Sequence, residues 1–254
     1  MDTPVHVDQV EGVQVITINR PEVRNAINTE SAVAIARALD ELDSCAALVA
    51  GVITGAGKTF CTGMDLKAFL AGERPSVEGR GFAGITEKSP TKPLIAAVEG
   101  HAVAGGFEIV LACDLIVASE TAIFGLPEVK RGLLAGGGGL LRLPRKVPYQ
   151  LAVEWCLTGE YFSAQLAHQA QLLNRLVPEG TALEEAVALA RIIAKNGPLA
   201  LQATKQILAE ARDWSSAEEF ARMREIYEPV RSSEDAKEGA LAFKEKRLPV
   251  WKGR

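Results

Sequence analysis

IAAVEGHAVAGGFEIVLACDLIVASETAIFGLPE, residues 95–128, is the stretch around which the rest of the chain is organised. It begins in a short apolar run, 94–98, and continues into a glycine-rich bend, 100–106. An apolar segment follows at 107–113, and a second apolar run comes at 115–118. We predict that 107–113 is helical, so the glycines form a tight turn into a helix.

Two glutamates, Glu108 and Glu128, interrupt surroundings that are otherwise almost free of charge. Charged residues are rarely buried unless they are paired or have a function. Acids in an apolar stretch are therefore candidates for acid/base chemistry. The alternative is that Glu108 lies on the solvated face of an ordinary strand-to-helix turn, and spacing alone leaves both interpretations open.

The glycine-rich bend supplies a second chemical feature. Ala104-Gly105-Gly106 precedes the predicted helix. The first turn of a helix presents unpaired N–H groups and the positive end of the helix dipole. Glycines allow a ligand to approach that backbone closely. An anion, or an oxygen that becomes an anion during a reaction, would be stabilised there.

The stretch resembles the crotonase (enoyl-CoA hydratase/isomerase) superfamily, nearest to its enoyl-CoA hydratase and carnitinyl-CoA dehydratase branches. The matching pieces in this stretch are 95–100, 104–108, Cys113-Asp114 and 124–128. Further matching pieces in the rest of the chain are 19–28, 60–67, 81–87, 233–239, 242–247 and 249–254. The resemblance implies an α/β spiral of repeated ββα units, the crotonase or ClpP-like fold. It also implies two regions, a core at 1–197 that carries the active site and a helical region at 198–254 that assembles trimers.

The same resemblance assigns roles to individual positions. It implies that Glu108 and Glu128 are the catalytic acids and that the backbone N–H groups of Thr62 and Gly105 form the oxyanion hole. Substrate-binding positions carried over from the family are Arg24, Ala26, Gly63, Met64, Asp65, Leu66, Phe82 and Gly106. Arg24 either lies near the CoA phosphates or is a solvated loop charge. Phe82 either lines the acyl pocket or only anchors its loop.

Because both family glutamates are present, we expect an enoyl-CoA hydratase, a lyase of fatty acid metabolism that adds water to a trans-2-enoyl-CoA thioester. The first alternative is carnitinyl-CoA dehydratase, acting on crotonobetainyl-CoA, which 81–87 and 249–254 favour. The others are an enoyl-CoA isomerase and a non-enzymatic RNA-binding protein. The 135–139 loop, AGGGG, departs from the family pattern and leaves the acyl-group preference open.

Composition narrows the other possibilities. A net charge of −4 disfavours a general nucleic-acid binder. The four cysteines form no CxxC pair, so neither disulfides nor a zinc site are expected, and a reducing cytoplasm fits. No secretory signal and no membrane span are expected. The three histidines are too scattered for a metal site, although His101, in the bend, is either structural or bonded near the site.

No cofactor is expected, because coenzyme A arrives as part of the substrate. The expected partners are that acyl-CoA thioester and further copies of the chain, as a homotrimer or a homohexamer built as a dimer of trimers. A P-loop at 55–59 is disfavoured because Val52 stands where the motif needs its first glycine.

The remaining pattern predicts the elements that surround the site. A hairpin is expected from strands at 5–7 and 13–18, and a buried strand at 47–54. Thr29, Ser163 and Thr181 are candidate caps. The expected helices are 29–43, 148–157, 163–172 and 181–195, then 198–243 with breaks near 214–215 and Pro229, and a short strand is expected at 176–177.

Overall fold

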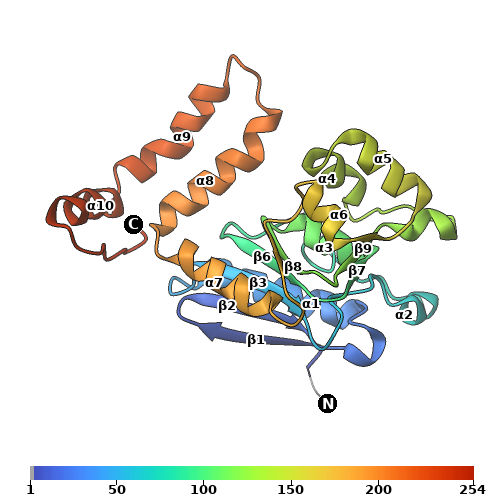
Figure 1. Ribbon diagram of the computed structural model, residues 1–254. Coiled ribbons are helices and arrows are strands. Elements are labelled where there is room, and N and C mark those ends of the chain that lie inside the picture. Colours follow the sequence, from blue (N-terminus) through green and yellow to red (C-terminus); the bar gives the residue numbers. More distant parts are fainter. Residues whose placement is uncertain (1–2) are drawn as a thin grey trace.

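The computed structural model describes residues 3–254, and its centre is a six-stranded sheet (Figure 1). The strand order is β1-β2-β3-β6-β8-β11. Their bounds are Val5–Val10, Val13–Ile18, Ala50–Gly55, Leu94–Val98, Leu115–Ser119 and Arg175–Val177, respectively. The β1–β2 hairpin is antiparallel and the other pairs are parallel. The predicted hairpin and the strand at 176–177 are confirmed.

The inner strands β2, β3, β6 and β8 are buried on both faces, and alternate residues of these strands pack against different helices. Ile16 and Ile53 point into a core shared with α1, Thr29–Ser44. Their neighbours in the strands, such as Val52, pack with α7, Ala182–Ala194. Strands covered on both faces need apolar residues on both sides, which explains their nearly continuous apolar sequence.

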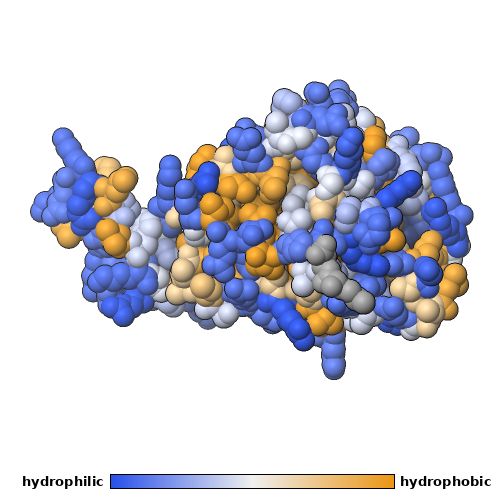
Figure 2. All heavy atoms as spheres, turned by 90° about the horizontal axis from the view of Figure 1, so that it is seen from below, coloured by the Kyte–Doolittle hydropathy of each residue, from blue (hydrophilic) through white to orange (hydrophobic). Residues whose placement is uncertain are grey.

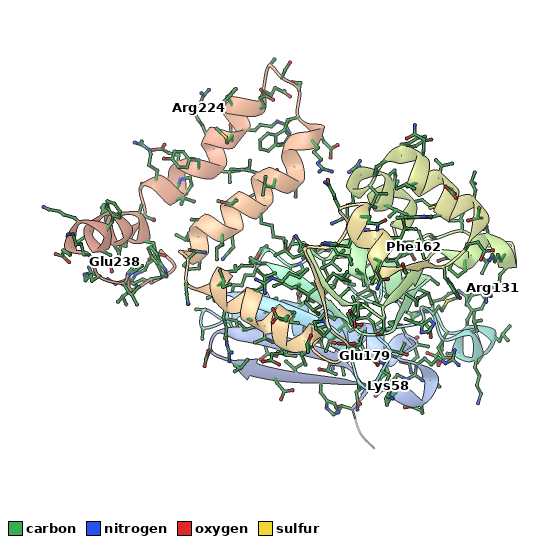
Figure 3. All side chains as sticks on the ribbon, in the orientation of Figure 1. Lys58, Arg131, Phe162, Glu179, Arg224 and Glu238 are labelled. Atoms are coloured by element: carbon green, nitrogen blue, oxygen red, sulfur yellow. The ribbon has the colours of Figure 1, made fainter. Side chains whose placement is uncertain are left out.

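The quoted stretch forms the centre of the mixed α/β core. Strand β6 leads through β7, His101–Val103, to α3, Gly105–Ala112. A second, three-stranded sheet has the order β10-β9-β7, in which β9 is Ile123–Gly125 and β10 is Phe162–Ser163. Phe162 lies inside this region beneath the helices (Figure 3), stacked on the Trp155 ring at 3.8 Å. Phe162 also packs against Phe107 of α3 and Phe124 of β9. Helix α3 carries Glu108, and β9 leads to Glu128.

Shorter elements complete the core. They are η1 Pro21–Val23, α2 Leu66–Leu70, β4 Ser76–Val77, β5 Gly81–Phe82, η2 Pro127–Arg131, α4 Gly139–Lys146, α5 Tyr149–Thr158 and α6 Ala164–Gln169. The predicted helices at 148–157, 163–172 and 181–195 are present with shifted ends.

The helix caps correct two predictions. Asn28, not Thr29, caps α1, because its side chain accepts the Ser31 amide. Ser163 caps α6 as predicted, by accepting the Leu166 amide. Thr181 precedes α7 but makes no cap, since its hydroxyl donates to the Pro178 carbonyl instead.

The last helices form a C-terminal arm, residues 198–254, that projects from the core (Figure 1, orange to red). It contains α8 Pro198–Glu210, η3 Ala211–Asp213, α9 Glu219–Arg231 and α10 Glu234–Glu245. The predicted break near 214–215 is confirmed. The break predicted near Pro229 is present but lies just after it: Pro229 is within α9, and the chain turns at 232–233, where the Ser233 hydroxyl caps α10.

Specific contacts attach the arm to the core. Lys205 of α8 pairs with Asp114 at 2.6 Å and donates to the Lys92 carbonyl. The end of the chain folds back, so that the Trp251 indole donates to the carbonyl of Lys195. Within residues 3–254 no helix is long and apolar enough to cross a bilayer. All four cysteines are free.

Candidate active site

A cavity of about 570 Å³ collects residues that lie far apart in the sequence. Four segments supply most of its walls: the loop before α2, the 81–87 segment, the start of α3, and η2 with the glycine loop that follows it. Predicted site residues that line it are Arg24, Thr62, Met64, Leu66, Phe82, Gly105, Glu108 and Glu128. The other predicted site residues, Ala26, Gly63, Asp65 and Gly106, are not among the described residues that line it.

Glu108 is held inside the protein and not on a solvated face. Every residue of α3 is buried, and Glu108 is only 4% exposed. Its Oε1 accepts the amide of Gly139 at 2.9 Å. Burial, with the nearby charge of Glu128, raises the pKa of Glu108 to about 7, although the amides of Gly139 and Gly137 and the charge of Arg142 oppose that rise.

Glu128 approaches the same cavity from η2, directly after Pro127. It is half-buried, and its Oε2 is buried with no hydrogen-bond partner within residues 3–254. Burial raises the pKa of the Glu128 carboxyl, against the lowering effects of its own amide and of Arg131. Two acids whose pKa values are both raised favour a state in which the pair retains a proton near neutral pH.

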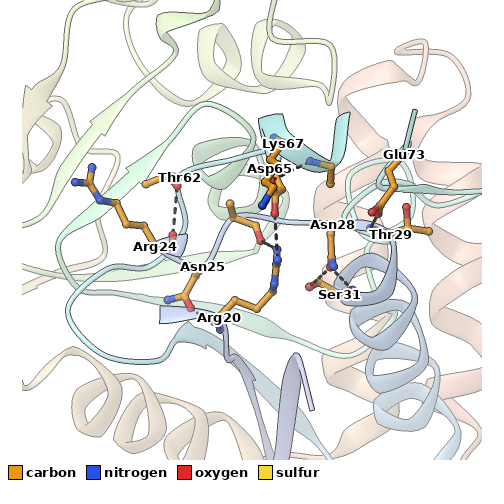
Figure 4. Close-up of polar contacts among 12 residues, drawn as sticks. Arg20, Arg24, Asn25, Asn28, Thr29, Ser31, Thr62, Asp65, Lys67 and Glu73 are labelled. Atoms are coloured by element: carbon orange, nitrogen blue, oxygen red, sulfur yellow. Dashed lines mark hydrogen bonds and ion pairs between the residues drawn. The ribbon is translucent and has the colours of Figure 1, made fainter. Parts of the chain in front are cut away.

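The backbone amides around the cavity differ from the prediction at one position. The Thr62 N–H donates to the Arg24 carbonyl at 3.2 Å, so it already has an acceptor. The Thr62 hydroxyl donates to the same carbonyl (Figure 4). The N–H groups of Met64 and Gly105 have no acceptor within the described chain. Gly63 brings the two loops together, because a Cβ there would lie 2.9 Å from the nitrogen of Gly105.

Asp65 has a structural task behind the cavity wall. Its carboxylate pairs with Arg20 at 3.1 Å and accepts the amides of Lys67 and Ala68, which caps α2 (Figure 4). Arg20 also donates to the carbonyl of Ala26. The pair therefore fixes the loop that carries Met64. The structural role of Arg20 was not predicted from the sequence. It precedes a proline at the end of a strand, and nothing in that local sequence distinguishes it from an ordinary surface arginine.

Two further glycines permit close packing around the acids. A Cβ at Gly106 would lie 2.1 Å from the Cys61 carbonyl oxygen, and one at Gly137 would lie 2.7 Å from Oε2 of Glu108. Gly106 thus allows α3 to approach the Cys61 segment, and Gly137 leaves room for the Glu108 carboxylate. The AGGGG loop at 135–139 is therefore part of the wall around this acid. This is the loop whose sequence departs from the family pattern.

Phe82 lines the cavity, and its neighbours anchor the segment that carries it. Its ring lines the cavity and lies against Gly105, where a Cβ would be 2.5 Å from ring Cε1. The neighbouring Ala83 and Ile85 are fully buried and anchor the segment. His101 also lines the cavity, edge-on to Tyr161 with ring centroids 6.5 Å apart. Within residues 3–254 no three side chains are grouped as metal ligands.

Comparisons with known proteins agree with this architecture. The sequence model of the enoyl-CoA hydratase/isomerase family matches residues 8–254. Enoyl-CoA hydratase EchA19 of Mycobacterium tuberculosis is 41% identical, over 94% of this chain and 93% of that protein. Carnitinyl-CoA dehydratase of Proteus mirabilis is 39% identical over the whole of both chains. The crystal structure of enoyl-CoA hydratase EchA1 from Mycobacterium marinum superposes with a TM-score of 0.98, at 54% identity and full coverage of both chains.

Proposed function

The chain belongs to the enoyl-CoA hydratase/isomerase family and has the crotonase fold, and from that premise we propose that it is an enoyl-CoA hydratase. This hydro-lyase would add water reversibly to a trans-2-enoyl-CoA and give a 3-hydroxyacyl-CoA. The observation that carries the proposal is that Glu108 and Glu128 line one cavity, beside the Gly105 amide at the start of α3, which has no acceptor in the described part of the chain.

The thioester oxygen gains negative charge as water adds to Cβ, and the amides of Met64 and Gly105 would stabilise it. Neither N–H group has an acceptor within residues 3–254, and the Gly105 amide also lies at the positive end of α3. This pair replaces the predicted pair of Thr62 and Gly105, because the Thr62 N–H is bonded to Arg24. Removing one such donor typically lowers turnover by about 10²–10³.

The two carboxyl groups would handle the protons of the added water. The water oxygen bonds to Cβ while one carboxylate takes a proton from that water. A proton from the other carboxyl group reaches Cα, so the elements of one water are added and the pair ends with the same number of protons. Raised pKa values support this arrangement, because a pair that retains one proton near neutral pH has both an acid and a base.

The substrate brings its own coenzyme A, so the proposed reaction needs no separate cofactor or metal. Arg24 and Arg131 both line the cavity. Cations at these positions suit the phosphates of coenzyme A. Arg24 has φ 54° and its carbonyl is fixed by Thr62, so the loop that presents it is held in one conformation.

Carnitinyl-CoA dehydratase is the second candidate, and Glu87 is the observation that favours it. Glu87 lines the cavity, is exposed, and is required by neither step of hydration. A carboxylate there would attract a cationic head group such as the trimethylammonium of crotonobetainyl-CoA. The relative from Proteus mirabilis carries the name of this activity.

One activity panel tests both candidates. Crotonyl-CoA, crotonobetainyl-CoA and a 3-enoyl-CoA are supplied separately, and loss of enoyl absorbance and product mass are followed. Hydration of the first substrate supports the general hydratase, and a kcat/KM at least tenfold higher for the second supports the dehydratase. Conversion of the 3-enoyl-CoA to a 2-enoyl-CoA without water addition would favour the isomerase and contradict the proposal.

We also propose that the C-terminal arm assembles copies of the chain into a trimer or a dimer of trimers, as a region separate from the core at 1–197. Large apolar side chains are exposed on the arm, above all Phe243 and Leu248, each 88% exposed. Figure 2 shows apolar surface on the arm at the left of the molecule. Single exposed apolar residues are common, but a group of them favours a protein partner.

A further inference from the structure

Arg142 of α4 is a partly buried cation that forms no ion pair within residues 3–254. Its Nη1 donates to the carbonyl of Gly137 at 3.3 Å, and its Nη2 donates to the carbonyl of Thr86. A charge removed from water without a counter-ion is costly, so its retention calls for a function. The function suggested by these contacts concerns the loops on either side.

The first contact fixes the loop that holds Glu108. Gly137 lies so close to this acid that a Cβ would be 2.7 Å from Oε2, and Gly139, two residues later, donates its amide to Oε1. Between them, Gly138 has φ 95°, and a Cβ there would lie 2.2 Å from Nη1 of Arg142. The guanidinium therefore lies directly against the loop whose amides hold the acid.

The second contact reaches the opposite wall. Thr86 belongs to the same short segment as Phe82, whose ring packs on Gly105. Thr86 is buried, and its carbonyl points at the guanidinium. One side chain thus joins the loop around Glu108 to the segment that packs against the unpaired amide at the start of α3.

The charge of Arg142 also acts on Glu108. Glu128 from η2 and Arg142 from α4 are the charged groups that act on Glu108, while Arg145 and Lys146, also from α4, interact with Arg142. Of these, Arg142 is the cation that lowers the pKa of Glu108, while Glu128 raises it. Loss of the guanidinium would therefore make the Glu108 carboxylate harder to form.

We propose that Arg142 is a positioning residue for hydration: it fixes the glycine loop around Glu108 and the Phe82 segment beside Gly105 in one relative geometry. The proposal rests on the hydratase function proposed above. Arg142 has no assigned contact with the substrate and acts through the two carbonyls that it binds. The five N–H donors of a planar guanidinium suit such a bridge, and the single ammonium of lysine does not reproduce it.

The test compares Arg142→Met and Arg142→Lys with Arg145→Met, a control that removes an exposed arginine one turn along the same helix. Crotonyl-CoA kinetics are measured against pH for each protein. A small displacement of a reacting group costs about 10²-fold. We expect kcat to fall about 10- to 100-fold in Arg142→Met and at least fivefold in Arg142→Lys, with KM changed less than threefold. In Arg142→Met the acid limb of the kcat profile should move to higher pH.

A second readout does not depend on turnover. The carboxyl carbon of Glu108 is titrated by ¹³C NMR in protein labelled at glutamate Cδ, with Glu108→Gln used to assign the signal. The midpoint should rise in Arg142→Met and stay unchanged in Arg145→Met. If the wild type hydrates no enoyl-CoA but this midpoint moves, the proposed function fails while the coupling of the two residues stands.

The result that overturns the proposal is wild-type kcat and an unmoved Glu108 midpoint in Arg142→Met. Equal losses in Arg142→Met and Arg145→Met would also overturn it, because they would point to general damage of α4. If Arg142→Met does not fold, Arg142→Lys decides: wild-type kcat in a folded Arg142→Lys contradicts the bridge, and a fivefold loss at an unchanged melting temperature supports it.

Discussion

The Oε1 atom of Glu108 accepts the backbone amide of Gly139 at 2.9 Å, although the two residues are 31 positions apart in the sequence. This bond ties the first turn of α3 to the start of α4 and holds a carboxyl group that is only 4% exposed. The acid is therefore fixed in place and raised in pKa by the same burial. Several consequences of this arrangement are open to measurement.

Replacement of either acid by its amide should nearly abolish hydration. Glu108→Gln and Glu128→Gln keep the shape of the side chain but cannot exchange a proton with water or with Cα. We expect kcat for crotonyl-CoA to fall by about 10²–10⁴ in each. Far-ultraviolet circular dichroism should be unchanged. Glu179→Gln, at an exposed position, is the control, and retention of wild-type turnover by either site variant would argue against the assigned roles.

The pH dependence of kcat should show an acid limb well above the range of an ordinary glutamate. Acidification protonates both members of the pair and removes the base that accepts a proton from water. Because burial raises both pKa values, the midpoint should lie between 4.5 and about 7. A midpoint below 4.5 would contradict the raised pKa values of the two acids.

The same raised pKa should make Glu108 unfavourable for stability at alkaline pH. The folded state binds its proton more tightly than the unfolded state, so the free energy of unfolding falls as pH rises from 4.5 to about 7. The cost at pH 8 is on the order of 3 kcal/mol. Glu108→Gln should therefore be more stable than the wild type in urea at pH 8, with little difference at pH 4. The reverse order would contradict the pKa direction.

The two acids were predictable from sequence, but the full site was not. Glu108 and Glu128 are two of the five acids in 95–128, and the family motifs at 104–108 and 124–128 single them out. The choice between the Thr62 and Met64 amides depends on a carbonyl of Arg24, a contact between loops that no local pattern encodes. Arg142 resembles an ordinary helix arginine until the chain folds.

The limits of local signals also appear in the helices. Thr29 is a good cap by residue type, yet Asn28 takes that place because its side-chain oxygen meets the Ser31 amide. Pro229 is a strong helix breaker by propensity, yet α9 continues two residues past it to Arg231. The β1–β2 hairpin was predictable because the alternation of apolar residues and the Glu11-Gly12 turn agree. The position of a helix end depends instead on which group pairs with the free N–H groups of the first turn or the free carbonyls of the last.

Substitution at Gly105 should disturb the start of α3 through Phe82. A Cβ in Gly105→Ala would lie 2.5 and 2.6 Å from two ring carbons, so the ring or the helix must move. We expect kcat to fall at least tenfold. Phe82→Leu in the same chain should recover part of the loss, because the contact that forces the shift is removed, and the two changes should be strongly non-additive. Additive losses would mean that the ring does not fix this amide.

Disruption of the exposed apolar residues on the arm should separate assembly from folding. Phe243 and Leu248 are the most exposed large apolar side chains described in the arm, and neither contributes to the buried core. Phe243→Ser combined with Leu248→Ser should therefore leave the core folded, while light scattering reports a smaller mass than that of the wild type. Leu183→Ser, an exposed position on α7 outside the arm, is the matched control. Serine in place of phenylalanine or leucine removes apolar area, so an interface at these residues would be weakened in the double variant. An oligomeric mass that is the same in the wild type, the double variant and the control would therefore place the contact between copies elsewhere on the surface.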